Sequence, residues 1–515
     1  MSASDPPAPG ADDWNHEATS IAHHEERTDT DFTVNRNQQE TSVNTNNHHP
    51  KPEEVDDSEN NYNDPFFVYR GGNQRIPADV AMVRIDPSVT VIPSSAFAGC
   101  AFLTIVEMHP QVTAIEALAF SSCASLEQIY LSHRLQRIGE AAFSFCSELS
   151  HVELPSSLEY LGERAFSSSG LETVRFVEES PISSLDDYEP KKPMIWGRGV
   201  FDLCLQLTTI RIPARLQVVA DQSFLGCERL TYVQFEKATI TTAKQLGCKR
   251  IGDRAFAACS ALQSIEWPDD NEIAALGIEA FDKCKALRSI RIPRKVTHLP
   301  SGIFAECESL SEIAFATKQN ECSLRSIARE AFRQCTALET IHIPPSVRQI
   351  GEGAFEGCRT LQRIDLGEGN HVQLTTISRK AFFMCLALEE VSLPYSVVYV
   401  GDRAFELCAS MRVIRFPSAR FSMGGEALVG CKSLCQIQLV AARSIPLSIW
   451  HWLIRQLLGS YLFGNGPRQR LTGSHVAPSV LFNFLTEHKS MLTDNWMPSR
   501  GRRRPRRPSS STDHG

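Results

Sequence analysis

Hydrophobic and polar positions recur in one pattern over most of the chain. Each unit reads Ile-Gly-x-x-Ala-Phe-x-x-Cys-x-x-Leu-x-x-Ile-x-Ile-Pro-x-x-Val, with some substitutions. The Phe of this unit stands at Phe97, Phe120, Phe143, Phe166, Phe201, Phe224, Phe256, Phe281, Phe304, Phe332, Phe355, Phe382 and Phe405, and Leu428 replaces it in a fourteenth unit. The shortest step between units is 23 residues, and other steps are only longer. Such spacing predicts stacked repeats with loop insertions.

Two periods within the unit predict its local structure. The Ile-x-Ile step has period two, which is typical of a strand with both Ile side chains on one face. The Ala-Phe-x-x-Cys-x-x-Leu step has a spacing of three, which predicts a single helical turn. Pro lacks an N–H and ends the strand, and Gly allows a crowded turn. We therefore predict a repeat solenoid: a rod of about fourteen 23-residue coils with short parallel strands and short helical turns.

Composition divides the chain into four parts. Residues 1–64 are acidic and poor in large apolar side chains, which predicts disorder, and residues 65–440 hold the solenoid, whose first coil is expected to be irregular. Residues 441–495 contain two amphipathic segments, which predict helices that cap the last coil or, alternatively, dock a partner. Residues 496–515 form a basic tail that is disordered by composition.

Charge is concentrated at the two ends. Residues 1–64 carry fifteen Asp and Glu against three Lys and Arg, and the last eighteen residues carry six Arg against one Asp. The body is close to neutral, which argues against a nucleic-acid groove along it. Contact with nucleic acid, or a nuclear localisation signal, is expected only from the tail residues Arg500, Arg502, Arg503, Arg504, Arg506 and Arg507. A plain solvated tail is the alternative.

Thirteen of the sixteen Cys occupy the same position of the unit. A catalytic Cys is normally one residue in a partly exposed, electropositive niche, whereas many equivalent copies indicate packing. We predict a ladder of reduced, structural thiols rather than disulfides or a chain of metals. No cofactor or metal site is predicted.

The N-terminus lacks the basic and apolar regions of a secretory signal, and the most apolar run, 445–463, is interrupted by His451, Arg455 and Gln456. The sequence therefore predicts an intracellular protein, cytoplasmic or nuclear, that is not secreted and does not engage a membrane.

The repeat resembles the BspA-type, or Treponema-type, leucine-rich repeat family over about residues 85–440. Ser169 stands where a Cys is expected and Leu428 where a Phe is expected, so two units depart from the pattern. The resemblance implies a leucine-rich-repeat solenoid that serves as a recognition surface.

Five insertions lengthen the base step, within 177–194, 236–250, 269–275, 316–325 and 367–375. Each follows the Ile-x-Ile strand and precedes the next Ala-Phe, so all should project from one edge. A common edge is typical of a binding edge, but drift in exposed turns has the same appearance.

The outward side chains of the predicted strands are the candidate working surface. Candidates for partner contact are Tyr130, Arg175, Arg211, Tyr232, Glu266, Arg291, His342, Asp365 and Arg415. Their signs alternate, which favours a protein partner over nucleic acid or a membrane. The chain has no recognisable catalytic motif, so we predict a non-catalytic protein-interaction scaffold. An enzyme with its site in the C-terminal helices or the 177–194 insertion is the weaker alternative.

Overall fold

The structure is a computed structural model of the 515-residue chain. It describes residues 64–72, 74–177, 192–236, 247–267, 273–315, 322–416 and 421–439. The chain divides into two units, Met1–Asp64 and Pro65–Gly515, and all described residues except Asp64 lie in the second. The predicted acidic segment before Asp64, the helical cap and the basic tail lie outside the described residues.

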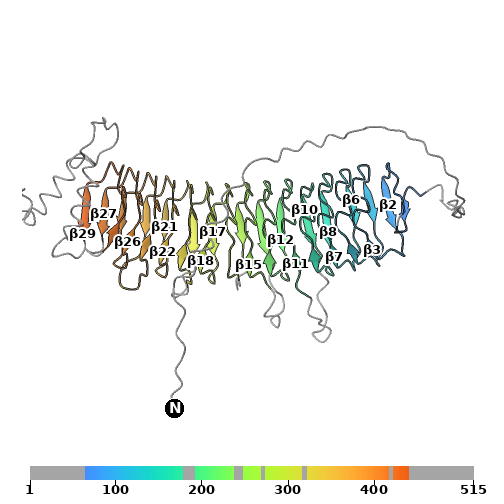
Figure 1. The fold of residues 1–515 in the computed structure, drawn as a ribbon, viewed down its shortest axis with the longest axis horizontal. Helices are drawn as coiled ribbons and strands as arrows, with labels where there is room; N and C mark the ends of the chain where they lie inside the picture. The colour runs from blue at the N-terminus through green and yellow to red at the C-terminus, as the bar shows by residue number, and fades with distance from the viewer. Residues whose placement is uncertain are drawn as a thin grey trace, which may run out of the picture. The chain divides into compact units, whose positions relative to one another are not determined.

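The described residues of the second unit form a β-solenoid of about fourteen turns with parallel strands (Figure 1). Each coil contributes a strand of three or four residues to the long-strand face. These strands are β1 (Phe67–Tyr69), β2 (Met82–Ile85), β4 (Ile105–Glu107), β6 (Gln128–Tyr130), β8 (His151–Leu154), β10 (Thr173–Phe176), β12 (Thr209–Ile212), β14 (Tyr232–Phe235), β16 (Ser264–Glu266), β17 (Ser289–Ile292), β19 (Glu312–Phe315), β21 (Thr340–His342), β23 (Arg363–Asp365), β25 (Glu390–Ser392), β27 (Val413–Phe416) and β29 (Gln436–Leu439). The predicted Ile-x-Ile strand is therefore confirmed.

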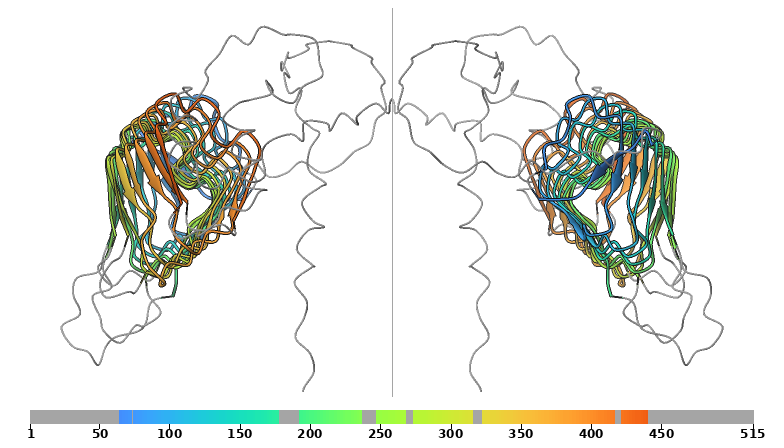
Figure 2. Two further views of the ribbon diagram at one scale, coloured as in Figure 1. Left: turned by 90° about the vertical axis from the view of Figure 1, so that its left-hand side faces the viewer. Right: turned by 90° about the vertical axis from the view of Figure 1, so that its right-hand side faces the viewer.

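Most coils also contribute a two-residue strand to a second, short-strand face. These strands are β3 (Val91–Ile92), β5 (Ala114–Ile115), β7 (Arg137–Ile138), β9 (Tyr160–Leu161), β11 (Ile195–Trp196), β13 (Val218–Val219), β15 (Arg250–Ile251), β18 (His298–Leu299), β20 (Ser326–Ile327), β22 (Gln349–Ile350), β24 (Thr376–Ile377), β26 (Tyr399–Val400) and β28 (Ser422–Met423). Viewed along the stack, successive coils nearly superimpose (Figure 2).

The Ala-Phe-x-x-Cys segment forms the third side of each coil, the turn side, and here the predicted helical turn is wrong. Alternate N–H groups donate to the next coil, as Phe97 does to the Ala119 carbonyl at 2.8 Å, while Cys100 N–H donates locally to Phe97 at 3.1 Å. Two residues per coil take left-handed φ, Ser95 at 58° and Gly99 at 75° in this one. In a helix the N–H groups bond to carbonyls of the same helix. Here alternate N–H groups bond to the next coil instead, so the segment forms paired turns.

The interior repeats with the coils. Stacked Phe rings run from Phe97 to Phe405 with centroids 5.0 to 5.6 Å apart, and Tyr69 meets Phe97 edge-on at 5.0 Å. Every one of these side chains is buried. Tyr69 of β1 thus covers the outer face of Phe97, the first ring of the Phe ladder. It precedes the coil expected to be irregular.

The Cys of each unit packs beside this Phe ladder. Twelve Cys thiols donate to the carbonyl of the Phe one coil back at 3.1 to 3.3 Å, as Cys123 does to Phe97. Where Ser169 replaces Cys, its hydroxyl donates to the Phe166 carbonyl at 2.8 Å. Burial raises the pKa of the Cys146 and Cys204 thiols to about 12. Both thiols are therefore protonated at neutral pH and act as packing groups.

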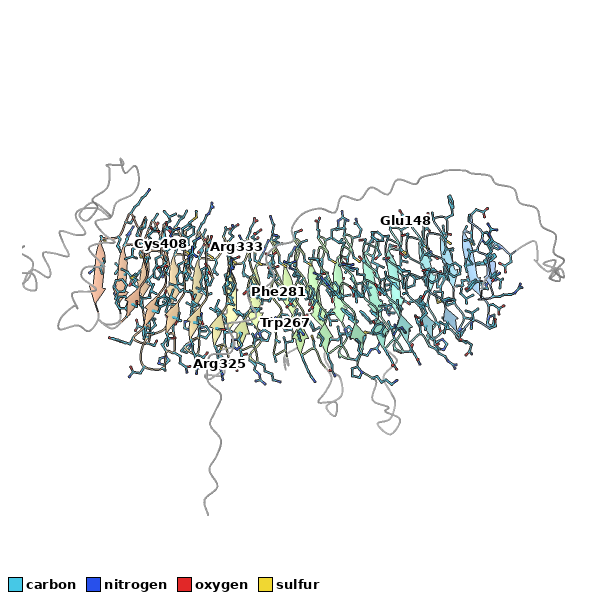
Figure 3. The ribbon with its side chains drawn as sticks, viewed as in Figure 1. Glu148, Trp267, Phe281, Arg325, Arg333 and Cys408 are labelled. Atoms are coloured by element: carbon cyan, nitrogen blue, oxygen red, sulfur yellow. The ribbon has the colours of Figure 1, made fainter. Side chains whose placement is uncertain are left out.

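The insertions attach at one edge of the coil. Each connects a long strand to the short-strand side that follows, as between β10 and β11 and between β14 and β15. In four of these coils an aromatic residue ends the long strand or directly follows it: Phe176, Phe235 and Phe315 end β10, β14 and β19, and Trp267 follows β16. Trp267 packs edge-on to Phe281 at 6.4 Å inside the stack (Figure 3).

Candidate partner-binding surface

The nine candidate residues all lie on the outward face of long strands. Tyr130 is on β6, Arg175 on β10, Arg211 on β12, Tyr232 on β14, Glu266 on β16, Arg291 on β17, His342 on β21, Asp365 on β23 and Arg415 on β27. Their inward neighbours, such as Ile210 and Ile290, are buried. The period-two pattern therefore placed these side chains on the correct face, and their role in partner contact stays a prediction.

Several candidates are engaged with neighbouring coils. Arg175 pairs with Glu153 of β8 at 3.1 Å, and both side chains are exposed. Tyr232 donates its hydroxyl hydrogen to Glu266, which also accepts from Gln234 at 3.0 Å. This hydrogen bond raises the pKa of the Tyr232 phenol. Such exposed pairs contribute little stability, but they fix the direction of each side chain.

The C-terminal half of the face contains two further linked groups. The His342 ring lies 2.7 Å from a carboxylate oxygen of Asp365. Partial burial raises the pKa of Asp365, but hydrogen bonds from Gly367 N–H and His342 outweigh it, so this pKa ends below its ordinary value. Arg415 pairs with Glu390 and donates to Gln438 at 2.7 Å.

Two candidates stand apart from these networks. Within the described ranges, neither Arg211 nor Arg291 forms a side-chain hydrogen bond or an ion pair, and both are exposed. A guanidinium group offers five donors in a planar fork suited to carboxylates. These two side chains are therefore the candidates most available to a partner.

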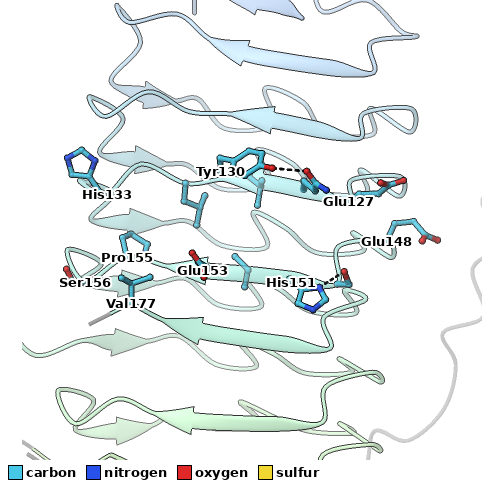
Figure 4. Close-up of a pocket in the computed structure, with 14 residues that line it drawn as sticks. Glu127, Tyr130, His133, Glu148, His151, Glu153, Pro155, Ser156 and Val177 are labelled. Atoms are coloured by element: carbon cyan, nitrogen blue, oxygen red, sulfur yellow. Dashed lines mark hydrogen bonds between the residues drawn. The ribbon is translucent and has the colours of Figure 1, made fainter. Parts of the chain in front are cut away.

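A groove of about 940 Å³ lies between β6 and β8 on the same face (Figure 4). Glu127 and Glu148 stand at one end, Tyr130 and Glu153 lie along the middle, and Pro155 is near the other end. Tyr130 is 56% exposed, and its hydroxyl donates to Gln128 at 2.9 Å. The groove therefore combines an aromatic face with carboxylates.

The backbone ladder of the long-strand face is interrupted at this groove. One sheet ends at β6 and the next begins at β8, and in this described part of the chain no backbone hydrogen bond joins the two strands. One coil later the N–H groups of Glu172 and Thr173 both donate to the Ser150 carbonyl, at 2.8 and 3.2 Å. The equivalent bonds from Ser150 and His151 to Glu127 are not formed.

A smaller hollow of about 340 Å³ lies on the turn side around Asp282. Ala257 and Ala305 flank this carboxyl in the adjoining coils, and burial raises the pKa of Asp282. Ion pairs such as Arg254 with Glu279 at 2.6 Å balance the charge at its rim.

Comparison with known protein families shows to which family this chain belongs. The model of the BspA type Leucine rich repeat region matches residues 79–188, 195–321, 239–361 and 325–446, well over half of the chain. The chain belongs to the BspA-type leucine-rich repeat family. The predicted resemblance is therefore confirmed, and the coils described above are the repeats of this family.

Solved structures of leucine-rich repeat proteins share the fold. A protein from Bacteroides ovatus is 26% identical with a TM-score of 0.57, and the match covers 70% of this chain and 88% of that one. A leucine rich cell surface protein from Faecalibacterium prausnitzii is 22% identical with a TM-score of 0.36, covering 75% and 92%. The pneumococcal vaccine antigen PcpA is 18% identical with a TM-score of 0.29, covering 70% and 78%. No curated protein matches the sequence.

These relatives correct the predicted location. The sequence indicated an intracellular protein that is not secreted, but the matching solved structures include a protein named as a cell surface protein and another named as a vaccine antigen. The prediction of an intracellular protein is therefore wrong, since a protein named as a leucine rich cell surface protein is among the matching solved structures. Among the described residues, none forms a helix long and apolar enough to cross a membrane.

Sequence reasoning missed the groove between β6 and β8. Glu127 and Glu148 were not among the candidates, because neither occupies the outward position between the two strand aliphatics. The step from Phe120 to Phe143 is the ordinary 23 residues. No insertion therefore marks the interruption of the ladder, and the spacing alone could not have found it.

Proposed function

We propose that this leucine-rich repeat protein is a non-catalytic scaffold that binds a partner protein with its long-strand face. One observation carries the proposal: outward side chains differ from coil to coil, whereas the inward side chains beneath them repeat. Arg211, Gln234 and Glu266, for example, lie on three successive strands, each directly after an aliphatic residue: Ile210, Val233 and Ile265. A rigid scaffold with varied side chains offers a partner a specific pattern at little ordering cost.

The chemistry of the cysteines supports a binding role over catalysis. A nucleophilic Cys needs a lowered pKa and access to substrate. Burial instead raises the pKa of Cys358 and Cys431 to about 12. The alternative of nucleic-acid contact through the arginine tail concerns residues outside the described ranges and stays a prediction.

Charge reversal on the long-strand face tests the proposal. The full chain with Arg211→Glu and Arg291→Glu is compared with wild type by affinity purification and mass spectrometry. A matched control, Lys249→Glu with Arg325→Glu, makes the same charge change next to the short strands β15 and β20. We expect the face variant to lose specific partners and the control to keep them. Retention of every partner by the face variant, or equal loss in the control, would reject this face as the binding surface.

A further inference from the structure

We propose that the groove between β6 and β8 binds an extended, arginine-bearing segment of a partner protein. The inference rests on the proposed function, because it assigns one part of the long-strand face to one class of partner segment. Its evidence is separate, however. It comes from unpaired main-chain groups, from the sign of the charges around the groove, and from the order of polar and apolar side chains along it.

The interruption at β6 and β8 differs from the others on this face. The long-strand face also changes sheet between β16 and β17 and between β19 and β21. In both of those places residues between the coils, 268–272 and 316–321, lie outside the described ranges at a predicted insertion. The coils of β6 and β8 follow each other at the base step with every residue described. The main-chain groups of β6 and β8 are therefore unpaired with each other although no insertion separates the two coils.

The two walls of the groove present main-chain hydrogen-bonding groups. Ser150 and His151 N–H groups have no backbone acceptor on β6, and the Glu127 carbonyl lacks the two donors that its counterpart Ser150 receives one coil later. Leu131 N–H likewise has no bond to β8, although the equivalent Met108 N–H donates to Tyr130 at 3.1 Å. Backbone groups of this kind are normally paired in folded proteins. An extended segment lying parallel to the strands supplies both donors and acceptors.

The charges select a cationic segment. Three carboxylates line the groove, from Glu127, Glu148 and Glu153, and its lining contains no Lys or Arg. Glu153 is already paired with the Arg175 guanidinium at 3.1 Å, so Glu127 and Glu148 are the carboxylates left for a partner's arginine. The exposed ring of Tyr130 lies between these carboxylates and offers a face for cation–π stacking (Figure 4). Arginine fits better than lysine, since its planar fork both stacks and pairs with carboxylates.

The other end of the groove contains apolar side chains beside His133 and Ser156. Pro155 and Leu131 line it, and Val177 is 39% exposed there. A segment that places arginine beside Glu127 and Glu148 therefore places an apolar residue at this end. In the basic tail of this chain, the large apolar residues Trp496 and Met497 precede the arginines, and Pro508 and four hydroxyl residues follow them. A segment parallel to the strands needs the opposite order, with its arginine before its apolar residue, because Glu127 precedes β6. This order of side chains favours a partner over the tail.

Binding of short peptides tests the inference with the full chain. The probes are fluorescein-labelled peptides with two arginines at one end, two leucines at the other, and spacers of one to four serines. A second set carries glutamates in place of the arginines. We expect saturable fluorescence anisotropy with at least one arginine peptide and none with its glutamate counterpart. Failure of every arginine peptide to bind wild type above its counterpart would overturn the proposal.

Variants locate the binding within the protein. Glu127→Gln with Glu148→Gln should weaken the best peptide about tenfold, as expected for lost charged hydrogen bonds. Tyr130→Ala should weaken it by about threefold to tenfold. The matched control, Glu312→Gln with Glu339→Gln, removes the same charge from β19 and the residue preceding β21. Equal weakening in groove and control variants would assign the binding to general charge, including the acidic residues 1–64, and overturn the proposal.

Two further measurements separate the outcomes. The amides of Ser150 and His151 should exchange hydrogen faster than those of Glu172 and Thr173 in the free protein and become protected when the peptide binds. Equally slow exchange in the free protein would refute the interruption. An unlabelled peptide of residues 498–515 that competes as strongly as the best probe would assign the groove to the tail instead of a partner. Loss of partners in the Arg211 and Arg291 variant leaves the proposed function standing even if no peptide binds.

Discussion

The turn side and the long-strand face are built from the same coils but carry different information. On the turn side Phe and Cys recur, and each thiol meets the same carbonyl of the preceding coil, as Cys307 meets Phe281 at 3.2 Å. On the long-strand face the outward residue changes from strand to strand, as from Arg291 on β17 to Ala314 on β19. The buried side chains thus repeat from coil to coil, whereas the outward side chains of the long strands vary. The difference separates residues that hold the register from residues that are free to recognise a partner.

The largest expected contrast is in thiol reactivity. Because burial raises the pKa of Cys146 to about 12, its thiolate population at pH 8 is about a thousandfold below that of an ordinary thiol. We expect a thiol reagent such as dithiobis-nitrobenzoate to label the exposed Cys435 at once and the ladder thiols only after denaturation. Raising the pH from 7 to 8 should leave the ladder thiols unlabelled. Rapid labelling of more than the three accessible cysteines, Cys100, Cys322 and Cys435, would contradict a packed ladder.

Removing one ring of the Phe ladder should cost the most stability. Phe281→Ala deletes a buried ring that stacks on Phe256 and Phe304 at 5.4 and 5.6 Å. The free energy of unfolding should fall by about 3–5 kcal/mol, measured by urea unfolding followed by circular dichroism. Phe145→Ala is the control, because Phe145 is 58% exposed on the same side of the coil, and its effect should stay within about 0.5 kcal/mol. Similar losses for both would mean that the buried stack does not hold the coils together.

A single thiol of the ladder should matter less than a ring. Cys307→Ala removes the hydrogen bond to Phe281 and a small buried group, so unfolding should become easier by about 1–2 kcal/mol. Cys435→Ala at an exposed site is the matched control and should be close to neutral. The same urea titration measures both. A neutral Cys307→Ala would show that the thiol fills space without a useful hydrogen bond.

The outward pairs should contribute least. A double-mutant cycle on Glu153 and Arg175, using Glu153→Gln and Arg175→Gln, should give a coupling free energy of about 0.2–0.5 kcal/mol. The coupling should shrink further at high salt because both side chains are exposed. A coupling comparable to the loss in Phe281→Ala would erase the distinction between the interior and the outward row.

The sequence predicted the repeat and the inward-outward assignment well because both follow from local spacing. Ile290 and Ile292 frame Arg291 with period two, and the structure buries the two Ile while exposing the Arg. It misassigned the Ala-Phe-x-x-Cys segment as a helical turn, since a spacing of three does not reveal that Phe97 N–H bonds to the next coil. The groove at Glu127 and Glu148 depends on bonds that fail to form between coils. A hydrophobic pattern does not encode such an absence.

The step between coils also limits the shape of a partner. Neighbouring strands repeat at about 4.8 Å, whereas an extended chain returns to the same face only every 6.7 Å or so. The side chains of a strand laid along the axis of the solenoid therefore no longer align with the coils after about two contacts. A helical turn of about 5.4 Å stays in phase somewhat longer. Long stretches of this face are accordingly matched by a folded surface or a helix, and an extended peptide is matched where it runs parallel to the strands, as it would in the groove beside Tyr130.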